Sequence, residues 1–322
     1  MKPILSLIAG LAAALITAGA AAQTDYPSKP VTLVTAFPAG SGPDAVLRLV
    51  ADKLGRLWSQ RVVVDNKPGG GGFIAIEQAR RAAPDGYTLL QLDSEHIAAL
   101  PHLYKSRNFV TLQHFDPVAS LFRTPFFVAV PTDSKWKNMS DMIAAAKAGP
   151  VSYGSWGVGS PGHLGAQQLE ALAGVQMQHV PYREVSQLYT NVGSGEVAWS
   201  FASIPSSQGV YKAGKLRYIA VATPKRVPQM PDVPTMAEAG GPAGLEVTSF
   251  VSLLAPKGVS PAVQSKINAD VAKVIADPEI RARFDTFAFE PLAWSPDEIR
   301  RQAEAKSKVY GELVRRGNIS LE

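Results

Sequence analysis

The fold is decided by residues 31–58, which read VTLVTAFPAGSGPDAVLRLVADKLGRLW. The first six residues are mostly β-branched or apolar, which is typical of a buried strand. A loop of small residues follows, and Asp44 then stands where a helix N-cap is expected. From Asp44 to Trp58, apolar side chains recur at the spacing of one helix face: Val46, Leu47, Val50, Leu54 and Leu57. This order of strand, small-residue loop and helix predicts one unit of an α/β fold.

The alternation of strands and helices continues beyond this unit. Residues 61–65 and 87–92 are predicted strands, and residues 73–83 form a helix between them, which gives βαβαβ and indicates a parallel sheet covered by helices. The pattern returns with strands at 126–130, 151–153, 197–201, 216–222 and 247–254, and helices at 138–148, 162–173 and 261–276. We therefore predict an α/β protein of two Rossmann-like lobes with a ligand cleft between them.

The domain boundaries follow from the same reading. A length of 322 residues suits two domains, and no Gly/Ser-rich linker separates them. Strands at 125–131 and 247–256 are therefore expected to cross between the lobes. We assign residues 23–124 plus 249–322 to lobe 1, and residues 125–248 to lobe 2.

The N-terminus predicts export. Lys2 precedes an apolar run over residues 4–16, and small residues follow up to Ala22, which is the pattern of a cleaved signal peptide spanning residues 1–22. The alternative is a membrane anchor, but the run is shorter than the roughly 20 residues that a spanning helix needs. We expect a soluble periplasmic protein.

Composition excludes several classes of function. The chain has no Cys, which removes disulfides, zinc–thiolate sites and cysteine nucleophiles. Lys and Arg number 32 against 27 for Asp and Glu, a modest and scattered excess that argues against nucleic acid. No His pair stands at metal-ligand spacing, and the small-residue loop at residues 37–44 lacks both the Gly-x-Gly-x-x-Gly spacing of a dinucleotide site and the Gly-Lys-Ser/Thr of a phosphate loop, so no metal or cofactor is expected.

Two loops carry the candidate site. The first loop, residues 37–44, and the second loop, residues 153–163, each join a strand to the start of a helix, where free N–H groups and the helix dipole favour an anion. Taken alone, each loop fits an ordinary glycine-rich turn as well as it fits an anion-binding loop. Together they would face each other across the cleft and bind a small acid at both ends. The candidate ligand-binding residues in these loops are Phe37, Ala39, Gly40, Ser41, Asp44, Ser155, Trp156, Ser160 and His163.

Histidine and serine leave an enzymatic alternative open. His163 suits a base, a carboxylate donor or a buried cap, and His96, which follows Asp93, Ser94 and Glu95, lies at the end of another strand. The alternative function is an exported hydrolase or isomerase that uses His163 with a loop serine. However, residues 157–162 (GVGSPG) do not fit the Gly-x-Ser-x-Gly pattern, and no orienting acid accompanies His163.

Three aromatic residues are candidates for the ligand wall. Trp156 lies inside the second loop, while Phe37 and Phe250 lie at strand ends that flank the predicted cleft. Each is either core or ligand wall, and their placement as a set favours contact with a ligand.

Several motifs give the chain a family resemblance. It resembles the Bug-type solute receptors of tripartite tricarboxylate transporters, and the likeness extends over essentially the whole mature chain in order and spacing. The matching segments are residues 26–34, 37–44, 64–72, 83–90, 154–164, 179–182, 219–223 and 233–240.

The resemblance implies a non-enzymatic periplasmic binding protein of the type II architecture. It implies closure of the two lobes on an organic carboxylate, which is then delivered to membrane transporter subunits. The pocket would be built by the first loop, by the loop near Ser94 and His96, and by the second loop. We expect a monomer.

Departures from the family pattern bear on the ligand. Arg183 and Glu184 stand where the family usually has Lys-Gly, and Ala202 replaces an Asp that can receive an amino group in relatives. The next residue, Ser203, joins the candidate ligand-binding residues. Because Trp156 also stands where smaller residues are common, these departures favour an aromatic or otherwise apolar-bodied carboxylate, for example the aromatic dicarboxylate terephthalate, over an amino acid.

Overall fold

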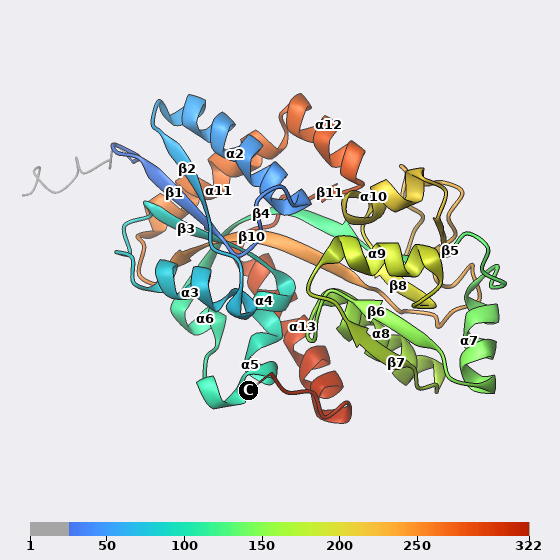
Figure 1. Ribbon diagram of the computed structural model, residues 1–322. Helices are drawn as coiled ribbons and strands as arrows, with labels where there is room; N and C mark the ends of the chain where they lie inside the picture. Colours follow the sequence, from blue (N-terminus) through green and yellow to red (C-terminus); the bar gives the residue numbers. More distant parts are fainter. Residues whose placement is uncertain (1–25, 322) are drawn as a thin grey trace, which may run out of the picture.

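The computed structural model describes residues 26–321 as two α/β lobes, each with its own sheet (Figure 1). The predicted signal peptide lies outside the described residues. The first sheet contains β1 (Val31–Thr35), β2 (Val62–Asn66), β3 (Thr88–Asp93), β4 (Phe115–Pro125), β10 (Thr248–Pro256) and β11 (Glu290–Pro291) in the order β11-β4-β10-β3-β1-β2. The second contains β5 (Phe127–Pro131), β6 (Ser152–Ser155), β7 (Gln178–Pro181), β8 (Trp199–Ala202) and β9 (Leu216–Val221) in the order β7-β6-β8-β5-β9.

Helices cover the sheets. Around the first sheet lie α2 (Gly42–Trp58), α3 (Phe73–Arg80), α4 (Ser94–Ala98), α5 (Leu100–Leu103), α6 (Thr111–His114), α11 (Pro261–Ile275) and α12 (Pro278–Phe287), with short 3₁₀ turns at Gly70–Gly72 and Lys105–Arg107. Around the second lie α7 (Met139–Ala148), α8 (Pro161–Ala173), α9 (Val185–Ser194) and α10 (Ile204–Lys212). Within residues 26–321, no helix combines the length and apolar character needed to cross a membrane.

The sheets are mixed: the parallel pairing predicted for the βαβαβ unit is confirmed, and antiparallel strands complete both sheets. β1 pairs in parallel with β2 and β3, and β6 with β7 and β8, as predicted. By contrast, β10 runs antiparallel to both β3 and β4, and β5 runs antiparallel to β8 and β9. The physical reason is the path of the chain: β4 leads toward the second lobe and β10 returns from it, so the two run in opposite directions.

The crossing between the lobes is short. Only Phe126 separates β4 from β5, and its backbone N–H donates to the carbonyl of Val247, the residue before β10 (3.3 Å). Figure 1 shows the paired β4 and β10 of the first sheet running through the middle of the molecule toward the second lobe. These two adjacent segments carry the chain from one lobe to the other.

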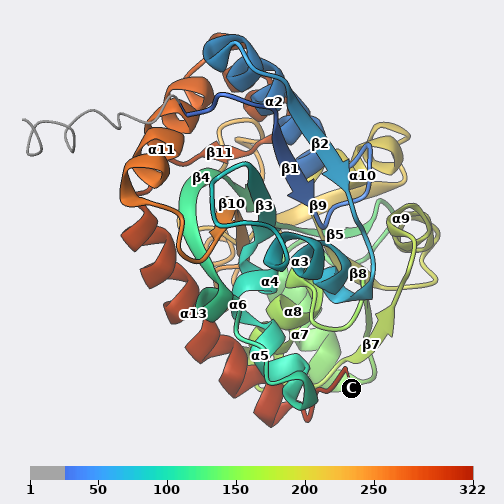
Figure 2. The same cartoon turned by 90° about the vertical axis from the view of Figure 1, so that its left-hand side faces the viewer.

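A long C-terminal helix, α13 (Pro296–Arg316), spans the junction. It packs on β4, on α4 and α5 of the first lobe and on α8 of the second, and Figure 2 shows its full length along one side. Its Lys306 Nζ donates to the carbonyl of Thr248, the first residue of β10 (2.6 Å).

The predicted apolar face of α2 is buried, with one exception. Val46, Leu47, Val50 and Leu54 have no exposed surface, but Leu57 is 39% exposed and Trp58 takes its place in the core. Since 54 and 58 are one helical turn apart, Trp58 continues the stripe. Its indole N–H donates to Asp270 Oδ2 of α11 (2.6 Å).

Candidate ligand-binding site

A cavity of about 800 Å³ lies between the two lobes. Both loops predicted from the sequence reach it, as do the start of α4, residues 183–186 before and within α9, and the start of α10. The predicted site residues that line it are Phe37, Ala39, Gly40, Ser41, His96, Trp156, Ser160 and Ser203. Those that do not are Asp44, Ser94, Ser155, His163 and Phe250, and each has a different buried role.

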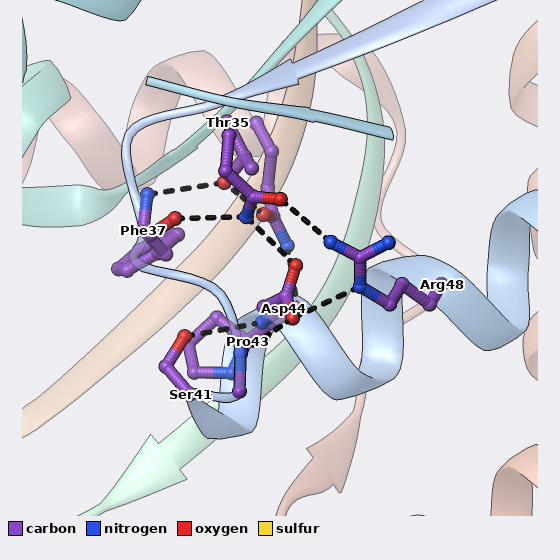
Figure 3. A network of polar contacts seen from close by, with 9 residues as sticks. Thr35, Phe37, Ser41, Pro43, Asp44 and Arg48 are labelled. Carbon is purple, nitrogen blue, oxygen red and sulfur yellow. Dashed lines mark hydrogen bonds and ion pairs between the residues drawn. The ribbon is translucent and has the colours of Figure 1, made fainter. Parts of the chain in front are cut away.

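Asp44 holds the shape of the first loop through hydrogen bonds to loop residues (Figure 3). Helix α2 begins at Gly42 with Ser41 as its N-cap, so the assignment of Asp44 as the N-cap is wrong. Ser41 Oγ accepts from the N–H of Asp44 (3.4 Å), and Asp44 Oδ2 in turn accepts from the N–H of Gly40 (2.8 Å). Gly40 has a φ of +81°, a conformation that glycine adopts without strain.

Asp44 is a buried carboxylate with its own counter-charge. Asn66 Nδ2 donates to Oδ1 (2.8 Å) and Arg48 Nε to Oδ2 (3.1 Å). Burial works against the charge, but the hydrogen bonds from Asn66, Gly40 and Arg48 outweigh it and lower the pKa of Asp44. Asp44 therefore shapes the first loop as an ionised carboxylate that is paired with Arg48.

The second loop is built in the same way from different residues. Helix α8 begins at Pro161 with Ser160 as its N-cap, and Ser160 Oγ accepts from the N–H of His163 (3.3 Å). The N–H of Gly159, whose φ is +79°, donates to His163 Nδ1 (3.1 Å). His163 thus occupies the position that Asp44 has in the first loop.

His163 is held neutral. Its ring stacks on His179 with centroids 4.1 Å apart, and burial together with this neighbour lowers the pKa of His163 to about 3. Because Nδ1 accepts a hydrogen bond, the ring proton resides on Nε2. The second loop is therefore supported by an uncharged side chain.

Ser155 lies within the second loop and away from the cavity. Its hydroxyl donates to the carbonyl of Gly157 (3.0 Å) and lies 2.7 Å from His179 Nε2. The expectation that this hydroxyl faces a ligand is therefore not met, because the fold gives it partners of its own. Parallel pairing of β6 with β7 places His179 opposite Tyr153 and brings its ring within reach of Ser155.

His96 faces the cavity and is paired with Asp93. Asp93 is the N-cap of α4 and accepts from both the backbone N–H (2.9 Å) and Nδ1 (2.6 Å) of His96. Burial would lower the pKa of His96, but the negative charge of Asp93 raises it overall. The other edge of the ring lies against Gly72, where a Cβ would come within 2.7 Å of Nε2.

Glu95 is a cavity residue that the sequence reasoning missed. It accepts hydrogen bonds from the hydroxyls of Ser94, Ser249 and Tyr310. Burial, and then the charge of Asp93, raise its pKa. Ser94 does not reach the cavity because it serves this network.

The aromatic residues divide between cavity and core. Trp156 lines the cavity and packs on two sides, with its ring 5.4 Å from Phe126 at the crossing and against Gly162, where a Cβ would lie 2.8 Å away. Phe250 is buried against Trp294 instead (5.4 Å). Aromatic lining residues absent from the predicted set are Tyr104, Phe126, Tyr189, Phe287 and Phe289.

Comparison with known proteins identifies the family. A family model described as the tripartite tricarboxylate transporter family receptor matches residues 46–319. The chain belongs to this family. The receptor is 35% identical over 314 residues to a protein of the gbd 5′ region in Cupriavidus necator, an alignment that covers 95% of this chain and 94% of the other.

Solved structures agree with this assignment. The receptor is similar to a structure described as a periplasmic transporter, with 31% identity, a TM-score of 0.81 and coverage of 92% of this chain and all of the other. It is also similar to Rpa4515 of R. palustris, solved with adipate, with 28% identity, a TM-score of 0.82 and the same coverage. The predicted two-lobed binding-protein fold is thereby confirmed.

Family membership decides the class of function. The protein is a periplasmic solute-binding receptor of a tripartite transporter system and not an enzyme. The alternative of a hydrolase or isomerase based on His163 is dropped, and the geometry agrees, because His163 is buried and its Nδ1 is engaged with Gly159. Among residues 26–321, no three His, Asp or Glu side chains are grouped to hold a metal ion.

Proposed function

We propose that the receptor captures a small organic carboxylate, specifically an aromatic dicarboxylate such as terephthalate, and delivers it to the membrane subunits of its transporter. The observation that carries this proposal is the composition of the cavity: aromatic walls combined with two small-residue loops, one from each lobe. A volume of about 800 Å³ is in the range of pockets that enclose small ligands.

The carboxylate class is supported by a relative. Rpa4515, which shares the fold over 92% of this chain, was solved with adipate, a dicarboxylate. Gly40 and Ser160 border the cavity, but the N–H of Gly40 donates to Asp44 (2.8 Å) and the hydroxyl of Ser160 donates to the carbonyl of Gly157 (2.7 Å). The backbone of Ala39 in the first loop and the hydroxyl of Ser41 at the start of α2 also border the cavity. These two groups are suited to hydrogen-bond a carboxylate.

An aromatic ligand is supported by the aromatic side chains that line the cavity. Phe37 and Trp156 come from opposite lobes and both border the cavity, so a flat ring can contact the two when the lobes close. A favourable aromatic pair contributes about 0.5–1.5 kcal/mol beyond the area it buries. An aliphatic dicarboxylate would use the same loops but lose this contribution.

Exclusion of amino acids is supported by the acidic residues of the cavity. Ala202 is fully buried and does not border the cavity, Asp93 is already paired with His96, and Glu95 has a raised pKa. Glu184 is the remaining carboxylate, and it is exposed. An ammonium group would find no buried, unpaired carboxylate among the lining residues.

A ligand panel tests the proposal. Thermal shift assays on the purified receptor with terephthalate, benzoate, adipate, glutamate and aspartate should give the largest rise in melting temperature for terephthalate, since a ligand that binds only the folded state stabilises it. Calorimetry on wild type and Trp156→Ala should show a greater loss of affinity for terephthalate than for adipate. Preferential binding of an amino acid would overturn the proposal, and equal losses for both acids would remove its aromatic part.

A further inference from the structure

We propose that Arg183 makes the receptor selective for ligands that carry a second negative charge. This inference rests on the proposed carboxylate function and deepens it. It assigns the second charge to lobe 2 and names the side chain that recognises it.

Arg183 is the only Lys or Arg among the residues that line the cavity. The other lining side chain able to carry a positive charge is His96, and its Nδ1 is engaged with Asp93. The charge of His96 is therefore shared with a neighbouring carboxylate, whereas that of Arg183 is permanent.

The guanidinium of Arg183 has no partner within the described part of the chain. It is exposed, and residues 26–321 provide it with neither a hydrogen bond nor an ion pair, although Glu184 is adjacent in sequence. Arg48 and Arg123 differ in this respect, because they pair with Asp44 and Glu290. Arg183 alone thus combines a position on the cavity with freedom to bind a ligand.

The chemistry of the guanidinium suits a carboxylate. In lobe 1, Asp44 is paired with Arg48 and Asp93 with His96, so these groups already have partners. In lobe 2, the planar guanidinium of Arg183 can bind a carboxylate with two parallel hydrogen bonds.

Matched pairs of ligands test this inference. Calorimetry would compare terephthalate with benzoate, and adipate with hexanoate, on wild type, Arg183→Gln and Arg183→Lys. A charge-assisted hydrogen bond predicts that Arg183→Gln weakens each dianion about tenfold and each monoanion less than twofold, with an intermediate result for Arg183→Lys. Raising the NaCl concentration should weaken dianion binding more in wild type than in Arg183→Gln.

Two further variants separate local from general electrostatics. Lys212→Gln removes one positive charge from an exposed site on α10 that does not line the cavity, and should leave the preference for dianions unchanged. Glu184→Gln removes the neighbouring negative charge and should strengthen dianion binding.

The outcomes are distinct. Equal weakening of dianions and monoanions by Arg183→Gln, or no change in either, overturns the assignment of Arg183 while leaving a carboxylate receptor. If no acid of the panel binds wild type, the proposed function fails, and this inference fails with it. An equal effect of Lys212→Gln and Arg183→Gln would attribute the preference to the overall charge of lobe 2.

Discussion

The first and second loops reach the same geometry with different chemistry. Each has a serine N-cap, a proline in the first turn of its helix and a glycine with a φ near +80° whose N–H donates to the side chain four residues later. That side chain is the charged Asp44 in one loop and the neutral His163 in the other. The comparison teaches that the backbone shape of such a loop requires a buried acceptor, whereas its electrostatic character depends on which acceptor is used.

The largest effect is expected from exchanging the acceptor in the second loop. Asp44 is stabilised by Asn66 and Arg48, but His163 has no basic partner, so His163→Asp would bury a carboxylate without compensation. We expect a loss of about 3–5 kcal/mol in the free energy of unfolding, measured by denaturant titration. His163→Asn, which retains an acceptor without a charge, is the control. If both variants were equally stable, the charge of the acceptor would be irrelevant.

A second comparison uses the two glycines. Alanine at either position would be strained in the left-handed conformation, which lowers the free energy of unfolding by about 1–2 kcal/mol. At Gly40 a Cβ meets no atom within 4 Å, but at Gly159 it would lie 2.4 Å from Leu103 Cδ1 of the opposite lobe. Gly159→Ala should therefore cost about 2–4 kcal/mol of stability and also weaken ligand binding by opposing closure.

The control for this clash is a double variant. Leu103→Ala removes the opposing side chain, so the affinity lost in Gly159→Ala should be partly recovered when both changes are combined. Equal stability and equal affinity of Gly40→Ala and Gly159→Ala would mean that the contact between Gly159 and Leu103 does not form.

A third test concerns the hydroxyls. Ser155→Ala removes the partner of His179 Nε2 and should reduce the free energy of unfolding by about 1–3 kcal/mol, with ligand affinity changed less than twofold, because Ser155 does not line the cavity. Ser41→Ala removes the N-cap of α2 and should cost about 1 kcal/mol. Calorimetry and denaturant titration on both variants measure the difference. A large loss of ligand affinity in Ser155→Ala would show that Ser155 does contact the ligand.

The smallest effect is expected in the pH dependence of binding. Asp93 holds the pKa of His96 above its usual value of 6.5, so His96 is cationic below the raised value and becomes neutral as the pH rises through it. Affinity for a carboxylate should therefore fall about threefold to tenfold over that range. His163 makes no contribution above pH 6, because its pKa is about 3.

Asp93→Asn tests the origin of this dependence. Without the Asp93 carboxylate, burial lowers the pKa of His96 and only the smaller contribution of Glu95 opposes it, so calorimetry between pH 6 and 9 should give a flatter profile at the weaker affinity. A flat profile in wild type would show that His96 does not carry charge toward the ligand.

Local patterns in the sequence were sufficient for the framework of the fold. The strand at 31–35, the helix that follows and the repeated αβ units are encoded by short-range periodicity, which is why their bounds agree with the structure to within a few residues. The antiparallel insertion of β10 was missed, since strand direction depends on how a distant segment returns through the sheet.

For the candidate site, the sequence by itself determined which loops border the cavity. Small residues between a strand and a helix identify such loops locally, and Phe37, Gly40, Ser41, Trp156 and Ser160 do border the cavity. Only the tertiary structure decided which side chains on those loops are free. Asp44, Ser155 and His163 are occupied by Asn66, His179 and Gly159, and Glu95 and Arg183 enter the cavity from other segments. The physical reason is that a polar side chain bonds to whichever partner the packed fold brings within about 3 Å, and that partner is usually distant in sequence.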